Sequence, residues 1–496
     1  MKSDIARPDP IILIIWVGLI ITAAITIKAK INFEGILIPG INGGYYPLQV
    51  RTLLEKGHLG FIDLPLVFWL EAIFSNLIAF ITKTDINSSI IYASKILDTF
   101  IPPLAAIPVA LISKEIFSFS KWKPIYLCLP SAFSVLSFSP LILTSDFQKN
   151  ALGIVWLFCL IYSLLKFQKC LKRKYLVLAI IYLILCGLTH FGCFSIALFF
   201  TVTNIVAYCF FNYKTKSVIK YLPIILLLVT LGFSLLFVLD KTRAFRMILF
   251  PVTFFKEPII LSILSKKAKV LPTDLFNLVF TNLFLFLTIF LLYKKSKLIP
   301  RQIKPFILTT ILVSFFLAFP LMGKEWAGRL LLMAFVPTTI LIGVVISLVN
   351  KLIIKRLITG IIVLVIFLSV IFILNIPHQP AISVEAFNEL KKLKDQVEIS
   401  DKTLIIARHG LEWWTAWVLD VKVAQDKALI KEDWKKYDRI LFLEQLKGKS
   451  AFGPQGSKIS LFPEPKIPRN AELIFINNYY RLYEAEEPKD FIYFSE

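Results

Sequence analysis

The sequence predicts a polytopic α-helical membrane protein with about eleven transmembrane helices and a small C-terminal α/β soluble domain. Hydrophobic residues make up 57% of the 496 residues, and 44 of them are Phe, whereas a soluble domain is about 45–50% apolar. Long apolar runs alternate with Lys/Arg clusters, which is typical of membrane spans and their loops. We therefore expect a transmembrane domain over residues 1–376 and an extracytoplasmic domain over residues 377–496.

The net charge of +22 is confined to the apolar part of the chain. Residues 377–496 hold 18 Lys/Arg and 19 Asp/Glu, whereas residues 1–376 hold 37 Lys/Arg and 14 Asp/Glu. Membrane topology explains an excess of basic residues between spans, so nucleic acid is not an expected partner.

The apolar runs give eleven candidate spans. The first is followed by Lys28-Ala29-Lys30 and not by a small-residue cleavage site, so it is expected to be retained and not cleaved as a signal peptide. The spans are expected at residues 10–28, 92–113, 124–143, 150–166, 175–190, 192–211, 220–239, 274–293, 304–322, 329–349 and 356–375. The joint at 188–192 is compatible with either a tight hairpin or a bend.

The apolar segment 64–81 is expected to lie at the interface or to re-enter the membrane without crossing it. If it does not cross, five loops that hold 19 Lys/Arg and one acid, Glu115, all face the cytoplasm. The N-terminus is then inside, and the cytoplasmic (inner) membrane is the expected location. Residues 31–91, 144–149, 240–273 and 323–328 form external loops, and the C-terminal domain is also external.

The C-terminal part shows mixed helix and strand patterns. Helical spacing covers residues 382–398, and strand-like runs cover Thr403–Ala407, Arg439–Leu443 and Leu473–Ile476. Asn477-Asn478 precedes Tyr479–Tyr483 and predicts a hairpin, while residues 448–468 are expected to form a loop.

Polar residues in the external loops are the candidates for chemistry, because few acids occur on that side. The third loop, 240–273, holds seven Lys/Arg, so it suggests an anionic partner or anionic head groups. The residues that we single out are Glu34, Tyr45, Tyr46, Arg51 and Asp63 in the first loop, Asp146, Gln148 and Lys149 in the second, Arg243 and Arg246 in the third, and Glu325 and Arg329 in the fourth.

These loops carry a family resemblance. In the first loop, Tyr45-Tyr46, Arg51, Leu53-Leu54-Glu55, Gly57, Leu59 and Asp63-x-Pro65-Leu66-x-Phe68-Trp69-Leu70 resemble the first periplasmic loop of GT-C glycosyltransferases. That group includes the protein O-mannosyltransferases and the lipid A aminoarabinose transferase. Asp146 stands where these enzymes carry an acid in their second external loop, and Arg329 with Pro337 resembles their helix start. The resemblance covers about residues 10–375.

The resemblance implies an inverting transfer of a sugar from a polyprenyl-phosphate-linked donor to an extracytoplasmic glycan, lipid or protein acceptor. Such a transfer needs a carboxylate base, for which the order of candidates is Asp146, Asp63 and Glu34. It also needs cations for the lipid phosphate, so the other residues singled out above are expected to bind substrate. The cofactor is left unknown: a divalent cation is the one candidate, and the sequence has no metal-binding motif.

The sequence departs from the family at one position, because Asn42-Gly43-Gly44 stands where the family usually has an Asp shortly before the Tyr-Tyr pair. A non-catalytic envelope polysaccharide assembly protein is therefore an alternative, and a lipid or solute transporter is another. Simpler roles also stay open: Asp146 could cap the following helix, Asp63 could end a turn, and Arg329 could snorkel at the interface. His409-Gly-Leu-Glu412-Trp413-Trp414 could stack on a sugar or serve domain packing.

Overall fold

The computed structural model describes residues 10–117, 124–212, 241–264, 272–449 and 463–488, together with the single positions 230, 234 and 237. The chain divides into two compact units. The first, called here the helical unit, contains Met1–Ile27, Phe100–Ile142 and Lys149–Ile373. The second, called the sheet unit, contains Lys28–Thr99, Leu143–Gln148 and Leu374–Glu496. The first long loop and the C-terminal part therefore belong to the same unit.

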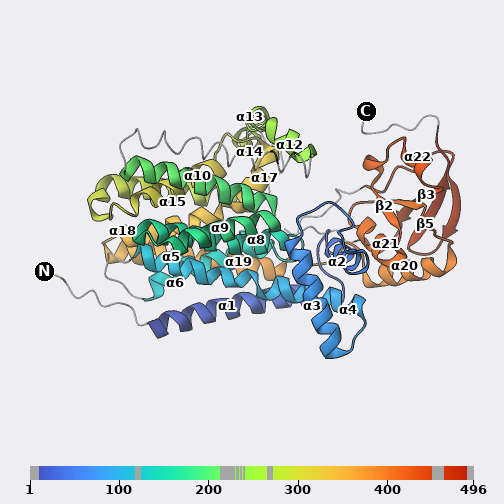
Figure 1. Cartoon of the computed structure of the whole chain (residues 1–496), viewed down its shortest axis with the longest axis horizontal. Coiled ribbons are helices and arrows are strands. Elements are labelled where there is room, and N and C mark those ends of the chain that lie inside the picture. Colours follow the sequence, from blue (N-terminus) through green and yellow to red (C-terminus); the bar gives the residue numbers. More distant parts are fainter. Residues whose placement is uncertain are drawn as a thin grey trace. The chain divides into compact units, whose positions relative to one another are not determined.

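Long helices that run side by side build the helical unit (Figure 1). Its elements are α1 (Pro10–Phe33, whose end belongs to the sheet unit), η1 (Pro102–Ala105), α5 (Ala106–Ile116), α6 (Pro124–Leu136), α7 (Phe138–Ile142), α8 (Gln148–Cys170), α9 (Arg173–Thr189), α10 (Phe191–Asn212), α12 (Lys241–Ile248), α13 (Phe250–Thr253), α14 (Ile259–Leu264), α15 (Pro272–Lys295), η2 (Ser296–Leu298), α16 (Lys304–Leu317), α17 (Lys324–Met333), α18 (Phe335–Leu348) and α19 (Leu352–Asn375).

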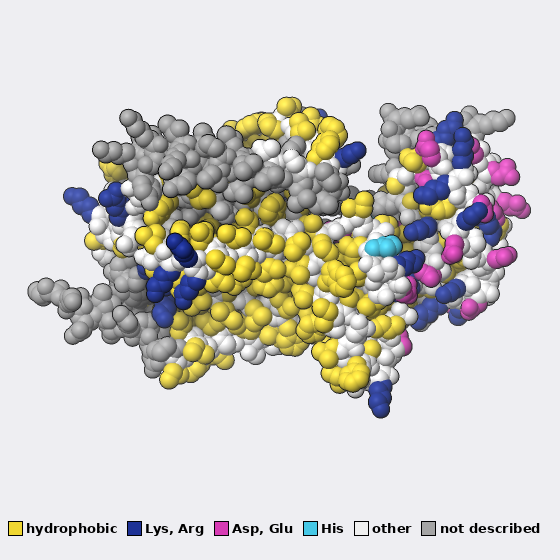
Figure 2. Space-filling view, in the orientation of Figure 1, with side chains coloured by type: hydrophobic (Ala, Val, Ile, Leu, Met, Phe, Trp, Pro, Cys, Tyr) yellow, Lys and Arg dark blue, Asp and Glu magenta, His cyan; other side chains and the backbone are white. Residues whose placement is uncertain are grey.

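Burial separates the centre of this bundle from its periphery. All 14 residues of α18 are buried, whereas α19 buries only Ile362, Ser369 and Ile373 along its 24 residues. Figure 2 shows hydrophobic side chains covering most of the described surface of the bundle on the visible face. Apolar surface on this scale requires a non-aqueous environment, so the chain is an integral membrane protein.

Seven helices in the described parts are long and apolar enough to span a membrane, and α17 with α18, bent by 50°, makes an eighth if the pair counts as one span. The expected number of eleven is not confirmed. The expected spans 175–190 and 304–322 form α9 and α16, of 17 and 14 residues, and 220–239 lies largely outside the described residues. Residues 188–192 form a hairpin joint, since extended backbone at His190 separates α9 from α10.

The sheet unit combines helices of the first long loop with a five-stranded sheet. Its elements are α2 (Tyr45–Lys56), α3 (Leu66–Thr82), α4 (Ile86–Phe100), α20 (Val384–Gln396), β1 (Thr403–Ala407), α21 (Leu411–Leu419), β2 (Lys422–Ala424), η3 (Asp426–Ala428), α22 (Asp433–Lys436), β3 (Arg439–Gln445), β4 (Glu472–Ile476) and β5 (Tyr480–Ala485). The apolar segment 64–81 forms α3, which has 17 residues; that it does not cross the membrane stays a prediction.

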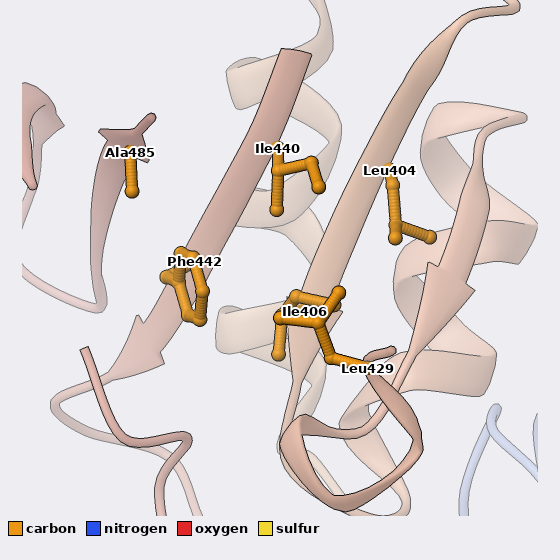
Figure 3. Packing of buried hydrophobic residues seen from close by; sticks show 6 residues of the cluster. All are labelled: Leu404, Ile406, Leu429, Ile440, Phe442 and Ala485. Atoms are coloured by element: carbon orange, nitrogen blue, oxygen red, sulfur yellow. The ribbon is translucent and has the colours of Figure 1, made fainter. Parts of the chain in front are cut away.

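The strand order is β2-β1-β3-β5-β4. β1 pairs in parallel with β2 and β3, and β5 pairs antiparallel with β3 and β4. All five residues of β1 are buried, because a parallel strand at the centre of a sheet is covered on both faces. On one face Leu404, Ile406, Leu429, Ile440, Phe442 and Ala485 pack together (Figure 3).

Most of the elements expected in this region are confirmed, including the helix near 382–398, the strand Thr403–Ala407 and the hairpin after Asn477. Ser383 caps α20 by accepting the N–H of Ala386, as a serine at this position should. The sequence interpretation did not predict α21 or β2. Part of the expected loop 448–468 lies outside the described residues.

Candidate functional site

The candidate site in the sheet unit is built around the glycine loop, residues 40–44. A Cβ atom on Gly40, whose φ is +91°, would lie 2.7 Å from Asp146 Oδ1. A Cβ on Gly43 would lie 2.2 Å from the carbonyl oxygen of Ile38, and one on Gly44 would lie 2.9 Å from the indole of Trp414. Any side chain would collide at these three positions, so the glycines allow the loop to pass closely between Asp146 and α21.

Asp146 is 4% exposed, and its side chain faces the glycine loop. Its Oδ1 accepts the backbone N–H of Asn42 at 2.6 Å, and further hydrogen bonds come from the backbone of Ile41 and the side chain of Asn42. Burial raises the pKa of Asp146 to about 6, although these hydrogen bonds and the charge of His409 act in the opposite direction. Asn42 therefore lies beside the Asp146 carboxylate and donates hydrogen bonds to it.

A buried polar cluster fixes the loop that carries Asp146. The Asp98 carboxylate accepts hydrogen bonds from Asn32 Nδ2 at 2.9 Å and from the backbone N–H of Ser145 at 2.8 Å. Lys28 donates to Thr144 Oγ1 at 2.9 Å and lies 3.9 Å from Asp98 Oδ1. The sequence interpretation missed this cluster. Its available signal was a Lys and an Asp near the ends of two apolar runs, where buried charges usually occur in pairs.

Asp63 has different surroundings. It is half-buried, and the phenol of Tyr45 donates a short hydrogen bond to its Oδ2. Gln49 Nε2 donates to the Tyr45 oxygen at 3.0 Å, and the Gln49 amide also bonds both backbone groups of Phe61 at 2.9 Å. These contacts fix the Tyr45 ring and the carboxylate together, and the structure thus brings Tyr45 and Asp63 into one hydrogen-bonded group.

Aromatic rings surround this group. The centroid of Trp413 lies 5.0 Å from that of Tyr45 and 5.1 Å from that of Phe61, both in edge-to-face geometry. Tyr46 is buried, and its hydroxyl donates to the carbonyl oxygen of Asp146 at 3.4 Å. The Tyr45-Tyr46 pair therefore connects the Asp63 region to the Asp146 loop.

Arg51, expected to bind substrate, lies against the C-terminal end of α21. It donates to the carbonyl oxygens of Trp417 at 2.6 Å and Ala416 at 3.1 Å, and it pairs with Asp420 at 3.1 Å. Its guanidinium also lies 4.9 Å from the centroid of the Trp417 ring. A cation is stabilised at a helix C-terminus, so these contacts attach α2 to α21.

Three other predicted site residues have surroundings of their own. Gln148 is buried, and its Oε1 accepts from Ser94 at 3.1 Å. Glu34 is exposed just after α1, and Lys149 is half-buried near the start of α8.

In the helical unit, the third and fourth loops that the sequence predicts to be external meet. The N–H of Gly323 donates to Phe254 O at 2.5 Å, that of Lys324 to Glu257 O at 3.1 Å, and that of Ile259 to Met322 O at 2.8 Å. A Cβ on Gly323 would lie 2.4 Å from the carbonyl oxygen of Lys256, so the approach requires glycine. The start of α17 is thereby fixed on the segment that follows α12.

The charged residues of α17 are exposed: Lys324, Glu325 and Arg329 all point away from its buried face, which carries Trp326. Arg243 and Arg246 lie in α12, and their side chains are outside the described residues. Within the ranges that the structure describes, no group of three or more His, Cys, Asp or Glu side chains is placed to hold a metal ion.

A third arrangement occurs at the start of α21, in the segment 409–414 for which the sequence left open sugar stacking or domain packing; the contact with Gln425 was not predicted. His409 Nδ1 lies 2.7 Å from Glu412 Oε1, and Gln425 Nε2 lies 2.8 Å from the same oxygen and 3.0 Å from His409 Nδ1. Glu412 is 1% exposed. The spacing of His409 and Glu412 along one helical turn was the available signal, but Gln425 enters through β2, which was not predicted.

One comparison with known proteins found a similar fold, and two found no match. Neither a protein-family model nor a curated protein sequence matches the chain. The crystal structure of the oligosaccharyltransferase of Archaeoglobus fulgidus in its apo form is similar, with a TM-score of 0.53 and 11% sequence identity over 87% of this chain and 69% of that chain. The protein therefore has a GT-C-like fold. At this identity the likeness concerns the fold alone.

Proposed function

We propose that this protein is a membrane glycosyltransferase that moves a sugar from a polyprenyl-phosphate-linked donor to an extracytoplasmic acceptor with inversion. The observation that carries the proposal is the fold likeness to an oligosaccharyltransferase over 87% of the chain. The carboxylates and cations of the external loops support it, since such a transfer needs both. The positive-inside pattern supports an inner-membrane location with the N-terminus inside and the sheet unit outside.

We assign the base to Asp63. A base must reach the acceptor, and Asp63 is half-buried and oriented by Tyr45. Asp146 is 4% exposed, and its carboxylate is bonded to the glycine loop, so we assign it to positioning that loop. Glu34 is exposed and has no partner among the described residues, so nothing orients it.

The proposed step conserves atoms and charge. The acceptor hydroxyl gives its proton to Asp63 while its oxygen attacks the anomeric carbon of the donor sugar. The bond from that carbon to the phosphate oxygen breaks on the opposite face, which inverts the configuration. The bonding electrons leave with the lipid phosphate as its negative charge, and the proton later passes from Asp63 to solvent.

Lys324 and Arg329, exposed on α17, are assigned to the donor phosphate, together with Arg243 and Arg246 of α12. The planar guanidinium of Arg can donate two parallel hydrogen bonds to two oxygens of one phosphate. The start of a helix also attracts anions, and α17 is fixed there by the backbone contacts of Gly323 and Lys324.

The test is transfer by the purified protein in detergent, supplied with radiolabelled polyprenyl-phosphate hexoses and pentoses. We expect the wild type to release lipid phosphate while the labelled sugar passes to an added hydroxyl acceptor or, without one, slowly to water, and we expect Arg329→Ala to reduce the rate by about 10²-fold, the usual effect of removing one charge-stabilising group. Arg356→Ala is the matched control, because Arg356 is exposed on α19 of the same unit and has no assigned role.

A wild type that consumes no donor, together with an unchanged glycolipid profile in a deletion strain, would overturn the proposal. That result would favour a non-catalytic assembly protein, which the substitution of Asn42 for the family's Asp already suggests as the second candidate.

A further inference from the structure

Four consecutive residues at the start of α21 carry buried polar atoms that lack a hydrogen-bond partner in the described protein. They are Glu412 Oε2, Trp413 Nε1, Trp414 Nε1 and Thr415 Oγ1. Buried polar groups are nearly always paired, because an unpaired buried group loses its hydration without gaining a hydrogen bond in return. A cluster of such groups within one turn is expected at a functional site, where local stability is lost for the sake of binding.

The same turn carries an oriented imidazole. The buried carboxylate of Glu412 lies 2.7 Å from His409 Nδ1, which favours a proton on Nδ1 and a hydrogen-bond acceptor at Nε2. The His409 side chain is 25% exposed, whereas that of Glu412 is 2% exposed. The pair therefore presents hydrogen-bond acceptors, with only the imidazole partly reached by solvent.

The turn also lies directly on the glycine loop. Gly410 has a φ of +90°, and a Cβ there would lie 3.1 Å from Ile41 Cγ2. One turn further, Trp414 approaches Gly44, and Trp413 packs edge-to-face against the rings of both Tyr45 and Phe61. The start of α21 thus adjoins the residue that holds Asp63, the proposed base.

The charged groups around the start of α21 indicate which class of ligand it would bind. Among the described residues, the carboxylates of Asp63, Asp146 and Glu412 outnumber the cationic groups of His409 and Arg408. Arg51 is engaged at the end of α21, and Arg408, whose charge also acts on Glu412, is bonded to Gln445 and to the carbonyl oxygens of Ala381 and His409. A surplus of carboxylates disfavours an anion and favours a ligand that donates hydrogen bonds. Aromatic rings additionally favour a ligand with apolar C–H faces.

We infer that the segment 409–415, together with Tyr45 and Asp63, binds the acceptor, and that the acceptor is a neutral carbohydrate. A sugar hydroxyl both donates and accepts hydrogen bonds, so a sugar can supply partners to the Glu412 carboxylate and the His409 imidazole, which accept, and to the unpaired indole N–H groups of Trp413 and Trp414, which donate. The C–H faces of a sugar suit the rings of Trp413 and Tyr45. A peptide offers fewer donors for the same surface. That the bound carbohydrate is the acceptor of the transfer rests on the proposed function. That this segment binds a carbohydrate does not rest on it.

The experiment measures binding by the full-length protein in detergent, without donor, using intrinsic Trp fluorescence and isothermal calorimetry. Three probe sets are compared: neutral hexose and pentose oligosaccharides, the same oligosaccharides phosphorylated, and peptides that contain Ser and Thr. We expect at least one neutral oligosaccharide to bind about tenfold or more tightly than its phosphorylated form and than the peptides.

Two substitutions locate the site. We expect Glu412→Gln and His409→Gln each to weaken binding of that oligosaccharide by about tenfold or more, as loss of a hydrogen bond to a charged group does. Glu432→Gln is the control, because Glu432 is exposed in the same unit and should bind as the wild type does. Thermal midpoints identify variants that have lost the fold. If a variant has lost the fold, the inference is tested by the relative affinities of the wild type for the three probe sets.

The inference would be overturned by a preference for phosphorylated oligosaccharides or peptides, by the absence of oligosaccharide binding, or by folded Glu412→Gln and His409→Gln variants that bind the oligosaccharide as tightly as the wild type. The proposed function fails separately, if the wild type binds a neutral oligosaccharide but transfers no sugar to any acceptor.

Discussion

The two aspartates that sequence analysis ranked highest lie in the same unit but in opposite surroundings. Asp146 is buried, and its carboxylate accepts backbone N–H groups of the glycine loop. The cluster around Asp98 fixes the loop that carries Asp146, through the N–H of Ser145. Asp63 is half-buried, is bonded to Tyr45 and lies beside aromatic rings. An enclosed carboxylate suits the role of holding a backbone, whereas a partly open, oriented one suits proton transfer. The predictions below test this difference, from the largest expected effect to the smallest.

Asp63→Asn should have the largest effect, because it removes the proposed base while keeping the size of the side chain. We expect transfer to fall by about 10²–10⁴-fold with an unchanged thermal midpoint. Asp401→Asn, at an exposed turn of the same unit, serves as the control. If Asp63→Asn retained transfer within threefold of the wild type while an Asp146 variant lost it, the two roles would have to be exchanged.

Gly43→Ala tests whether the glycine loop is tightly enclosed. The added Cβ would lie 2.2 Å from the Ile38 carbonyl oxygen, so the loop must shift, at a cost of about 1–3 kcal/mol. We expect a lower thermal midpoint and weaker transfer. Gly35→Ala is the matched control, since nothing lies within 4 Å of a Cβ at Gly35. Equal midpoints for the two variants would contradict the close approach of the loop.

Asp146→Asn tests the enclosed carboxylate through pH. The pKa of Asp146 is raised from 3.8 to about 6 in the fold, so the folded state holds the proton more tightly than the unfolded state. The free energy of unfolding should therefore fall as pH rises from about 4 to about 6, by on the order of 1–3 kcal/mol, and Asn should remove this dependence. The measurement is the thermal midpoint of both proteins from pH 4 to 7, and a constant difference between them would refute it.

Tyr45→Phe should have the smallest effect. It removes the hydroxyl that donates to Asp63 and accepts from Gln49, while the ring contacts with Trp413 are kept. A hydrogen bond to a charged group is worth about 1.5–3 kcal/mol, so we expect kcat to fall by roughly tenfold, which is less than for Asp63→Asn. A loss as large as that of Asp63→Asn would mean that Tyr45 itself takes part in proton transfer.

Apolar runs and charge clusters were enough to predict a membrane protein, because a lipid environment requires long apolar helices whatever they pack against. The same patterns predicted α20, β1, β3 and the β4–β5 hairpin, since alternation and turn residues are local signals. α21 and β2 were missed: α21 is short, and its apolar residues face α2 and β1, so its periodicity is dictated by partners that are distant in sequence.

The sequence by itself determined that the chain is rich in long apolar runs, and it proposed as candidates for chemistry the few acids, arginines and tyrosines of the loops predicted to be external. Only the tertiary structure decided which of these residues contact one another and how exposed each side chain is. Hydrogen bonding and burial depend on contacts between residues that are distant in sequence, such as Arg51 and Trp417, which are 366 positions apart. The glycines of residues 40–44 were visible from the start. Only the fold explains them, as the places where Asp146 and Trp414 leave no room for a side chain.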